Sequence, residues 1–274
     1  MSKRSTRRAR APSFSARTAD KHTLYEASVQ DTEADIQFIH RVFKKERGRK
    51  PLSLREDFCG TAKLCADWVG SDPERTAVGL DLHQPTMDWG AARHIEALGK
   101  GKSRVRLLNR NVMDGISQKV DVTVAFNFSY CALKDRSDML RYFKRVHRDL
   151  GKEGIFFLDI HGGTESFEEM EETTKHYGFT YVWDQGPYDA VNGYALRHIH
   201  FRFPDGTEMK RAFTYDWRLW TLPELRDILT AAGFSRVDTY WEGADADGSG
   251  NGVFRKVSRA DNELSWIAYI VGHK

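Results

Sequence analysis

The feature that most constrains this chain is a regular alternation of short buried strands and amphipathic helices between Leu52 and Ile160. "TAVGLDL", "RVRLLN" and "DVTVAFNF" are apolar runs rich in β-branched residues, which is typical of buried strands. "SDMLRYFKRVHRDLG" repeats its apolar residues at helical spacing, and Gly151 is expected just past the end of that helix. This alternation predicts a three-layer α/β fold, with a parallel sheet covered by helices on both faces.

The pattern changes after about residue 175. "RHIHFRFPDGTEMKRAFTYDW" alternates apolar and polar residues, and its Pro-Asp-Gly at 204–206 is a strong hairpin-turn signal. We therefore expect an antiparallel β-hairpin insert or lid over about residues 175–219, placed after the fifth strand. Beyond it, Thr221 and Glu224 predict a capping box at the start of a helix. "RVDTYWE" and "SWIAYIVG" predict two late strands.

The positive charge of the chain is concentrated at its start. Six basic residues precede the first acid, Asp20, whereas the remaining sequence has 36 basic and 39 acidic residues. We interpret residues 1–18 as a basic, disordered and solvated tail. Two alternatives stay open: a tether to RNA or to another anionic surface, and an Arg- and Ser-rich signal for import into an organelle.

Composition also argues against several classes of protein. No apolar run reaches the roughly 18 residues that a membrane-spanning helix needs, so we expect no membrane association. The three cysteines form no CxxC pair, and His198 and His200 have no third ligand at useful spacing, so no metal site is expected. The cysteine pattern favours a reducing compartment, and we predict a cytoplasmic location.

The stretch "LREDFCGTAKLC", residues 54–65, has the layout of a ligand-binding turn. A strand is expected to end near Asp57, the chain turns at Cys59-Gly60-Thr61, and a helix follows. In parallel α/β sheets, ligands bind at the carboxyl ends of the strands. The start of the helix offers free backbone N–H groups, and Gly60 permits a close approach to the backbone.

Asp81 ends the next expected strand, 21 residues after Gly60. A carboxylate at this position can accept hydrogen bonds from both hydroxyls of a ribose. The G-x-G-x-x-G pattern of NAD-binding proteins is incomplete, because Phe58 and Ala62 occupy the places of its first and third glycines. The two features together predict a nucleoside cofactor without a pyrophosphate, and they disfavour an NAD-dependent oxidoreductase.

The same residues carry a family resemblance. "LREDFCGTAKLC…AVGLDLHQPTM" resembles the class I S-adenosylmethionine-dependent methyltransferases, whose first motif reads like LDLGCGTG and whose second strand reads like VGVDxS. "LLNRNVMD" and "DVTVAFNFSYCAL" resemble the third- and fourth-strand motifs. The resemblance covers about residues 52–274, with the hairpin region as an insert. It implies a Rossmann-like seven-stranded sheet with an antiparallel last strand, in a domain of residues 19–274 whose N-terminal helical cap covers residues 19–50.

The resemblance also implies a site for S-adenosylmethionine, with S-adenosylhomocysteine as product. The strand-end acid of the family falls on Glu56, and Asn111 stands where an acid usually meets the adenine amino group. Tyr25 and Arg55 are placed to bind the methionine carboxylate; a surface salt bridge is the alternative for Arg55. The expected cofactor-binding residues are Tyr25, Arg55, Glu56, Phe58, Cys59, Gly60, Thr61, Asp81, Leu82, Asn111, Val112, Asn127 and Phe128.

Acceptor residues are expected after the fourth and fifth strands and in the insert. His161, at the end of the fifth strand, is expected to take a proton from the acceptor, with a hydrogen-bonding loop histidine as the alternative. Tyr130 is the second expected catalytic residue. The aromatic residues of the insert are predicted to form a slot for a flat or cationic acceptor, with packing onto the sheet as the alternative. The expected substrate-binding residues are Ser129, Tyr181, Trp183, Tyr188, Arg218 and Trp220.

The sequence therefore predicts a methyltransferase that moves the methyl group of S-adenosylmethionine in line to a nitrogen or oxygen of a small molecule. Because a closed pocket suits small ligands, the lid-like insert favours this function over the alternatives. The alternatives are an RNA or protein methyltransferase tethered by the basic tail, and a cofactor-binding protein without methyl transfer.

Overall fold

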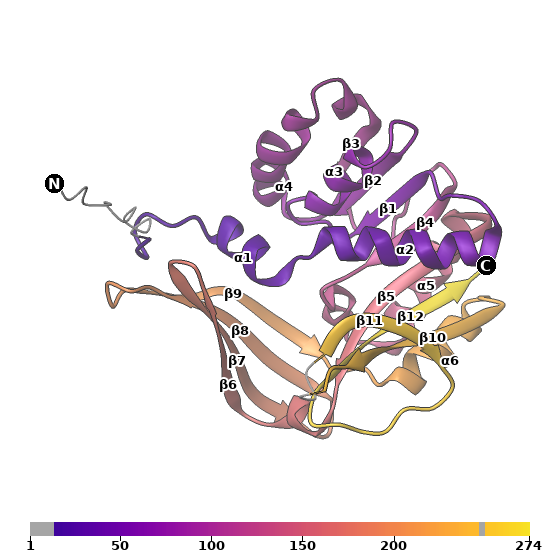
Figure 1. Ribbon diagram of the computed structural model, residues 1–274. Coiled ribbons are helices and arrows are strands. Elements are labelled where there is room, and N and C mark those ends of the chain that lie inside the picture. The colour runs from indigo at the N-terminus through magenta and orange to yellow at the C-terminus, as the bar shows by residue number, and fades with distance from the viewer. Residues whose placement is uncertain (1–13, 247–249) are drawn as a thin grey trace, which may run out of the picture. The chain divides into compact units, whose positions relative to one another are not determined.

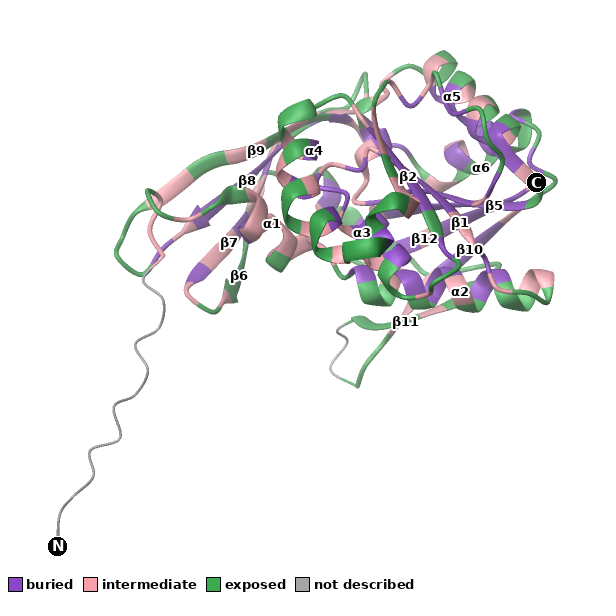
Figure 2. Cartoon of the chain, turned by 90° about the horizontal axis from the view of Figure 1, so that it is seen from above, coloured by how far each residue is buried: buried purple, intermediate pink, exposed green. Residues whose placement is uncertain are grey.

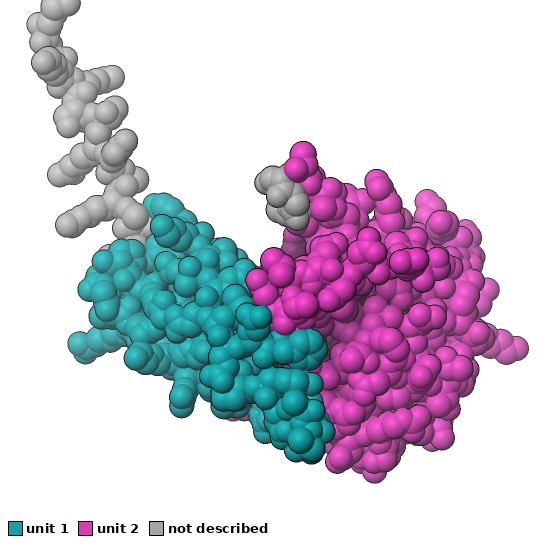
Figure 3. All heavy atoms as spheres, turned by 90° about the horizontal axis from the view of Figure 1, so that it is seen from below, with its two compact units in different colours: residues 1–30, 167–217 teal, residues 31–166, 218–274 magenta. Residues whose placement is uncertain are grey.

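The computed structural model of the protein describes residues 14–246 and 250–274. The chain divides into two compact units, which Figure 3 shows in different colours. Unit 1 consists of residues 1–30 and 167–217, and unit 2 consists of residues 31–166 and 218–274. Each unit is thus assembled from segments that are far apart in the sequence.

Unit 2 is built on a mixed eight-stranded sheet (Figure 1). Its strands, in sheet order, are β11 (Gly250–Val257), β10 (Arg236–Ala244), β12 (Trp266–His273), β5 (Leu150–Gly162), β4 (Val120–Ala125), β1 (Ser53–Asp57), β2 (Thr76–Asp81) and β3 (Val105–Asn109). The strands from β5 to β3 are parallel, and β12 runs antiparallel between β5 and β10. The antiparallel last strand is therefore confirmed, and the expected count of seven is corrected by β11, which pairs with β10 at the sheet edge.

Helices cover both faces of this sheet, as a three-layer fold requires. The helical segments of unit 2 are α2 (Thr32–Arg47), α3 (Lys63–Gly70), α4 (Gln84–Gly90), η1 (Ala91–Ile95), η2 (Glu96–Arg104), η3 (Ser129–Ala132), α5 (Arg136–Asp149) and α6 (Leu222–Ala231). Helices α2 and α3 pack on one face, where Phe38 and Trp68 join a buried cluster with Val124. On the other face, Phe143 of α5 contacts Phe156 with ring centroids 5.6 Å apart. Figure 2 shows the central strands β1, β5 and β12 as largely buried and the edge strand β11 as largely exposed.

Local sequence signals explain where several helices begin and end. Asp31 accepts a hydrogen bond from the Ala34 N–H and caps α2, which ends at Gly48 in left-handed conformation (φ 70°). The predicted capping box of Thr221 and Glu224 is confirmed at the start of α6. Gly151 lies just past the end of α5, as expected, because the helix ends at Asp149 and Leu150 is its C-cap; the chain passes directly into β5 there.

Unit 1 contains a four-stranded sheet, larger than the expected hairpin. Its strands, in sheet order, are β6 (Met170–His176), β7 (Phe179–Asp189), β8 (Tyr194–Arg202) and β9 (Glu208–Arg218), and the short helix η4 (Thr164–Phe167) precedes them. The sheet begins at residue 170 instead of about 175. The predicted turn at residues 204–206 is confirmed between β8 and β9, where the Phe203 N–H donates to the Thr207 carbonyl.

Helix α1 (Lys21–Val29) belongs to unit 1 and not to a continuous cap over residues 19–50. Leu24 of α1 is buried in a cluster with Ile199 and Phe201 of β8, and Phe14 packs against the same cluster. The Ala16 N–H donates to Thr207 Oγ1 at 2.9 Å. The expected tail is therefore corrected for residues 14–18, which contact the sheet, while residues 1–13 lie outside the described residues.

Two findings bear on the class of protein. Within residues 14–246 and 250–274, no helix combines the length and the apolar character needed to cross a membrane. All three cysteines, Cys59, Cys65 and Cys131, are buried free thiols.

Candidate functional site

The candidate site follows from the order of the parallel strands. Strands β2, β1, β4 and β5 are neighbours in unit 2 and run in the same direction, so their carboxyl ends meet at one edge of the sheet. This is the edge at which ligands of such sheets bind. The loops that follow these four strands hold most of the expected cofactor-binding residues.

The turn after β1 is tight, although it has only one glycine. Phe58, Gly60 and Ala62 all have left-handed backbone angles, with φ values of 57°, 53° and 54°. Such angles are unfavourable for residues with a side chain, so the surrounding structure must hold them in place. The Cys59 N–H donates to the Leu80 carbonyl at 3.0 Å, and the Ala62 N–H donates to the Cys59 carbonyl at 2.7 Å. Hydrogen bonds thus replace the flanking glycines that the family motif has.

Asp81 joins this turn to the end of β2. Its Oδ2 accepts a hydrogen bond from the Gly60 N–H at 2.9 Å, and its Oδ1 accepts one from the His83 N–H at 2.7 Å. The space in front of Gly60 is open, since a Cβ placed there would meet only the methyl group of Thr86 at 4.0 Å. The structure therefore brings Gly60 and Asp81 together, as their spacing predicted.

The residue after Asp81 adds an apolar surface to this corner. Leu82 is 69% exposed, which is unusual for a leucine next to a sheet. Asn109, at the end of β3, donates hydrogen bonds from its Nδ2 to the carbonyls of Asp81 (3.2 Å) and Leu82 (2.9 Å). The sequence analysis missed Asn109, whose only signal was its place at the end of the third predicted strand.

Arg55 does not have the environment expected of a residue that binds the methionine carboxylate. Its side chain is fully buried and donates hydrogen bonds to Asp57 at 2.7 Å, to Asp149 at 2.8 Å and to the Val112 carbonyl at 2.8 Å. Asp57 also accepts a hydrogen bond from the Tyr142 hydroxyl. This buried network corrects the prediction for Arg55, because every face of its guanidinium is occupied by the protein itself.

Glu56 lies on the opposite face of β1 and is also buried. Its Oε2 accepts a hydrogen bond from the Cys65 N–H at 3.0 Å, and burial raises its pKa to about 8. Cys59 and Thr61 are almost fully buried in the turn itself. Glu56 and these two residues support the shape of the loop, and their contact with a cofactor stays a prediction.

The loop after β3 is ordered by its own side chain. Asn111 Oδ1 accepts a hydrogen bond from the Met113 N–H at 2.9 Å, which leaves its amide nitrogen for another partner. Val112 is buried, and its carbonyl binds Arg55. The structure thus places Asn111 and Val112 beside the β1 network, and their roles toward adenine stay predictions.

The turn after β4 is held by a residue that the sequence analysis left out. Asn127 and Phe128 have φ values of 56° and 57°, and both donate backbone N–H groups to the Asp159 carboxylate, at 2.6 and 3.0 Å. Burial raises the pKa of Asp159 to about 7, although the two N–H groups act in the opposite direction. The signal that could have found Asp159 is its place on the neighbouring strand, two residues before His161.

The two expected catalytic residues differ sharply in environment. His161 is partly exposed at the end of β5, and its ring lies edge-on to Phe128 with centroids 4.6 Å apart. Tyr130 is fully buried, and its hydroxyl donates to the Asp159 carbonyl at 2.7 Å. The prediction of a catalytic Tyr130 was therefore wrong, because a buried hydroxyl bound to the backbone holds no substrate. Ser129 donates its hydroxyl to the Phe126 carbonyl at 2.9 Å and remains partly exposed.

Two expected substrate-binding residues have structural partners. Arg218 donates to the Lys134 carbonyl and to Glu224, at 3.0 and 3.1 Å, and its guanidinium lies 3.8 Å from the ring centroid of Trp220. Trp220 is 4% exposed and donates its indole N–H to the Leu133 carbonyl. These contacts correct the prediction that Arg218 and Trp220 bind the substrate. The two side chains instead attach the segment after η3 to the start of α6.

Four expected residues belong to unit 1. A β-bulge between Gln185 and Tyr188 brings the side chains of Tyr181, Trp183 and Tyr188 to one face of the sheet. The sequence analysis missed two further aromatics, Tyr215 and Trp217, which pack against Trp183 with ring centroids 6.4 and 6.0 Å away.

Helix α1 contributes Tyr25 to the same unit. Its ring lies 4.9 Å from that of Phe213, and a side-chain hydrogen bond joins it to Tyr215. The roles of Tyr25 toward the cofactor, and of Tyr181, Trp183 and Tyr188 toward the acceptor, stay predictions.

Comparison with solved structures finds similar folds over most of the chain. An S-adenosylmethionine-dependent methyltransferase from Clostridium acetobutylicum is 18% identical, with a TM-score of 0.67 over 92% of this chain and 96% of the other. The sugar N-methyltransferase KedS8 from Streptoalloteichus is 18% identical, with a TM-score of 0.61 over 100% and 98% of the two chains. CalS10 from Micromonospora echinaspora, an amino pentose methyltransferase, is 12% identical, with a TM-score of 0.64 over 92% and 96%.

The chain has the fold of the S-adenosylmethionine-dependent methyltransferases, as its sequence motifs predicted. No model of a known protein family matches it, and no curated protein matches its sequence.

Proposed function

We propose that this protein is an S-adenosylmethionine-dependent methyltransferase that acts on a nitrogen or oxygen of a small molecule. The observation that carries the proposal is the contact of Asp81 with the Gly60 N–H at the junction of β1 and β2. A carboxylate fixed at this point, beside an open glycine, is what the ribose of a nucleoside cofactor requires.

The residues at this corner fit such a cofactor. Each carboxylate oxygen of Asp81 accepts one backbone hydrogen bond and keeps a lone pair for a ribose hydroxyl. Leu82 offers an exposed apolar surface for the flat face of adenine, and Asn111 keeps an amide nitrogen free to donate to a ring nitrogen. We infer that Gly60, Asp81, Leu82 and Asn111 hold the nucleoside.

When bound, S-adenosylmethionine supplies a methyl group on a sulfonium that a nucleophile can displace in line. The chain has to position the acceptor, exclude water and remove a proton where the acceptor carries one. Asp159 fixes the turn of Asn127 and Phe128, and Phe128 contacts the His161 ring. The imidazole of His161 can take the proton of an amine or hydroxyl near neutral pH, so we assign the base to His161.

We further propose an amino sugar, or another amine of similar size, as the acceptor. Two of the similar structures are named as a sugar N-methyltransferase and an amino pentose methyltransferase. Unit 1 carries partly exposed aromatic side chains, among them Tyr181, Trp183 and Tyr215, and side chains of this kind stack on sugar rings and bind cations on their faces.

The cofactor assignment is tested by calorimetry with S-adenosylmethionine. Asp81→Ala should weaken binding by about 1–3 kcal/mol, because two ribose hydroxyls and two backbone N–H groups lose their acceptor. Asp81→Asn keeps one oxygen and should have an intermediate effect. The matched control is Asp114→Asn, which alters an exposed acid after β3. Unchanged affinity of Asp81→Ala, or no binding by the native chain, would contradict the assignment.

Methyl transfer is tested with a panel of amino sugars, other amines and hydroxyl compounds. His161→Asn should lower kcat for the accepted amine by about 10²–10⁴-fold, the usual contribution of a general base, and should leave cofactor binding unchanged. Tyr130→Phe should keep kcat within a few-fold, because the hydroxyl is bound to the backbone. Cofactor binding without turnover on any acceptor would indicate a binding protein instead of an enzyme.

A further inference from the structure

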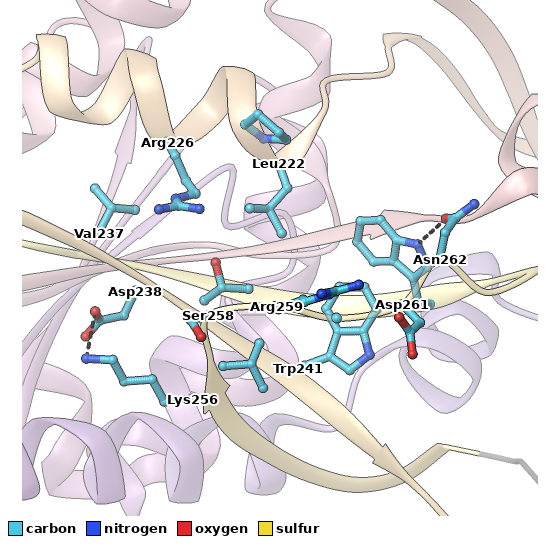
Figure 4. A pocket seen from close by; sticks show the side chains of 15 residues that line it. Leu222, Arg226, Val237, Asp238, Trp241, Lys256, Ser258, Arg259, Asp261 and Asn262 are labelled. Carbon is cyan, nitrogen blue, oxygen red and sulfur yellow. Dashed lines mark hydrogen bonds and ion pairs between the residues drawn. The ribbon is translucent and has the colours of Figure 1, made fainter.

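A separate cavity lies beside helix α6 in unit 2, and none of the expected cofactor or acceptor residues lines it. Its walls come from the start of α6, from β10, from the end of β11 and from the segment 257–266. Its volume is about 600 Å³, which is within the usual range of small-molecule sites. We call this cavity the α6 groove, and Figure 4 shows its side chains.

Two tryptophans form an apolar wall of the α6 groove. Trp241 of β10 and Trp266 at the start of β12 have ring centroids 4.6 Å apart and planes inclined by 37°. Asn262 Oδ1 accepts a hydrogen bond from the Trp266 indole N–H at 3.4 Å, which links the pair to the neighbouring segment. A partly exposed pair of this kind can stack on a flat aromatic ring.

Two arginines of the groove, Arg226 and Arg259, have no hydrogen-bond or ion-pair partner for their side chains among the residues that the structure describes. Arg226 extends from α6 and Arg259 from the segment after β11 (Figure 4). Over residues 14–246 and 250–274, neither guanidinium forms a hydrogen bond or an ion pair. This contrasts with Arg218 and Arg236, which are paired with acids at their positions near α6.

The charge of the lining favours an anion. The third basic residue, Lys256, is paired with Asp238 at 2.8 Å, so these two charges offset one another. Asp261 is the remaining acid, and the lining is positive by one unit. Because Arg226 and Arg259 offer planar sets of N–H donors, they suit a carboxylate or a phosphate.

A smaller cavity of about 350 Å³ continues the groove along α6. The two cavities share Pro223, Arg226 and Val237, so Arg226 lies between them. Thr230 and Ser235 line the smaller one and add hydroxyl groups. Both hydroxyls already donate to backbone carbonyls, those of Arg226 and His273, so the guanidinium of Arg226 is the donor that the two cavities share for an anionic group.

We propose that the α6 groove binds a small aromatic anion, with its ring on Trp241 and Trp266 and its anionic group held by one of the two arginines of the lining, Arg226 or Arg259. The ligands that fit this description have a flat ring that carries a carboxylate or a phosphate, as in an aromatic acid or a nucleoside monophosphate. The site is separate from the proposed methyl-transfer site, so it does not depend on that function.

The proposal is tested by calorimetry and by NMR of the indole N–H groups, with 1-naphthyl phosphate as the first probe. We expect binding with a Kd of about 1 mM or tighter, which is reasonable for a ligand of this size. 1-Naphthol lacks the anionic group and inorganic phosphate lacks the aromatic ring, so each should bind at least about tenfold more weakly. The affinities of 1-naphthoate and adenosine 5′-monophosphate, measured in the same way, show whether the groove prefers an aromatic carboxylate or a nucleotide.

Substitutions of the lining residues test whether the ligand binds in the α6 groove. Arg226→Gln or Arg259→Gln, whichever arginine holds the anionic group, should weaken the binding of 1-naphthyl phosphate about tenfold, since the substitution removes a charged hydrogen-bond donor. Trp241→Leu should weaken the binding of 1-naphthyl phosphate by a similar factor. In the native chain, the indole N–H signals of Trp241 and Trp266 should shift as 1-naphthyl phosphate is added. The matched control is Arg106→Gln, an exposed arginine on β3 at the opposite edge of the sheet. None of these variants should alter S-adenosylmethionine binding.

Three results would overturn the proposal. The first is that neither 1-naphthyl phosphate nor 1-naphthoate binds at millimolar concentration. The second is that the arginine variants bind as tightly as the native chain, which would place the ligand elsewhere. The third is equal affinity for 1-naphthol, which would remove the anionic group from recognition.

Discussion

Buried acids at the candidate site fall into two groups. Asp57 and Asp149 are neutralised by the fully buried Arg55. Glu56 and Asp159 are also buried and Asp35 is partly buried, yet within the described chain none of the three forms an ion pair. Burial accordingly raises their pKa values to about 6, about 8 and about 7. Such groups are neutral in the folded state over a pH range in which they would be charged in water.

This difference predicts a pH dependence of stability that Glu56→Gln should reduce. The pKa of Glu56 is higher in the folded state (about 8) than in the unfolded state, so folding is favoured by the protonated form. Its contribution is complete below the unfolded pKa and is lost as pH rises toward 8. Between pH 5 and pH 8, the free energy of unfolding of the native chain should fall by about 1–3 kcal/mol more than that of the variant.

Urea unfolding at several pH values measures this prediction. Asp35 and Asp159 are present in both proteins, so their effects cancel in the comparison. A matched control is Glu169→Gln, because Glu169 is exposed. Parallel pH profiles of the native chain and Glu56→Gln would show that Glu56 keeps an ordinary pKa in the folded protein.

At this scale the sequence predicted the site only in part. The contact between Gly60 and Asp81 followed from the spacing of a strand, a helix and a second strand, which local sequence encodes. The burial of Arg55, Tyr130 and Trp220 could not be predicted, because their partners lie far away in the chain. The sequence alone does not show whether the partner of a polar residue is a ligand or another residue of the protein.

The turn after β1 also depends on a neighbouring element, helix α4. A Cβ on Gly90 of α4 would lie 1.9 Å from the carbonyl oxygen of Thr61, so the helix backbone touches the turn directly. No side chain can be accommodated there unless α4 or the turn moves. Gly90 is therefore required by a close approach of two backbone segments at the candidate cofactor site.

Gly90→Ala should destabilise the protein by about 1–3 kcal/mol, the usual cost of overpacking, and should weaken S-adenosylmethionine binding by displacing the turn. The matched control is Gly70→Ala in α3, where the new Cβ would lie 3.6 Å from Leu98. This control should be neutral or stabilising by up to about 1 kcal/mol, since alanine favours helix. Thermal unfolding and calorimetry test both variants, and equal effects would contradict the close approach.

Most elements of the large sheet were predictable because strand and helix patterns alternate clearly. Strands β6 and β11 were missed for physical reasons. β6 has the sequence "MEETTKH", in which nearly every residue is polar, and β11 has two glycines and is largely exposed. Both lie at sheet edges, where a strand needs little apolar surface and leaves no periodic signal.

At the scale of the whole molecule, unit 1 depends on a short N-terminal segment. Leu24 of α1 is 2% exposed and packs in the cluster with Ile199 and Phe201 of β8. Residues 14–30 thereby supply part of the small apolar core of a sheet that is encoded more than 130 residues later. Loss of this contact should lower the stability locally, in unit 1.

Leu24→Ala should lower the local stability of unit 1 by about 2 kcal/mol, a typical cost for a truncated core leucine. Hydrogen exchange should report this as about thirtyfold faster exchange of the β8 amides, while amides of β1 and β4 in unit 2 keep their rates. Val191→Ala, at a residue that is 92% exposed between β7 and β8, is the matched control. Equal acceleration in both units would show that they open together.

The position of β12 has a consequence for synthesis on the ribosome. Among the described strands this one is translated last, yet it lies inside the large sheet, between β5 and β10. Until it emerges, the nascent chain holds two separate edges, β5 on one side and the β10–β11 pair on the other. The final closure of unit 2 must therefore wait for release of these residues, and a partly made chain would expose open strand edges to chaperones and to neighbouring polypeptides.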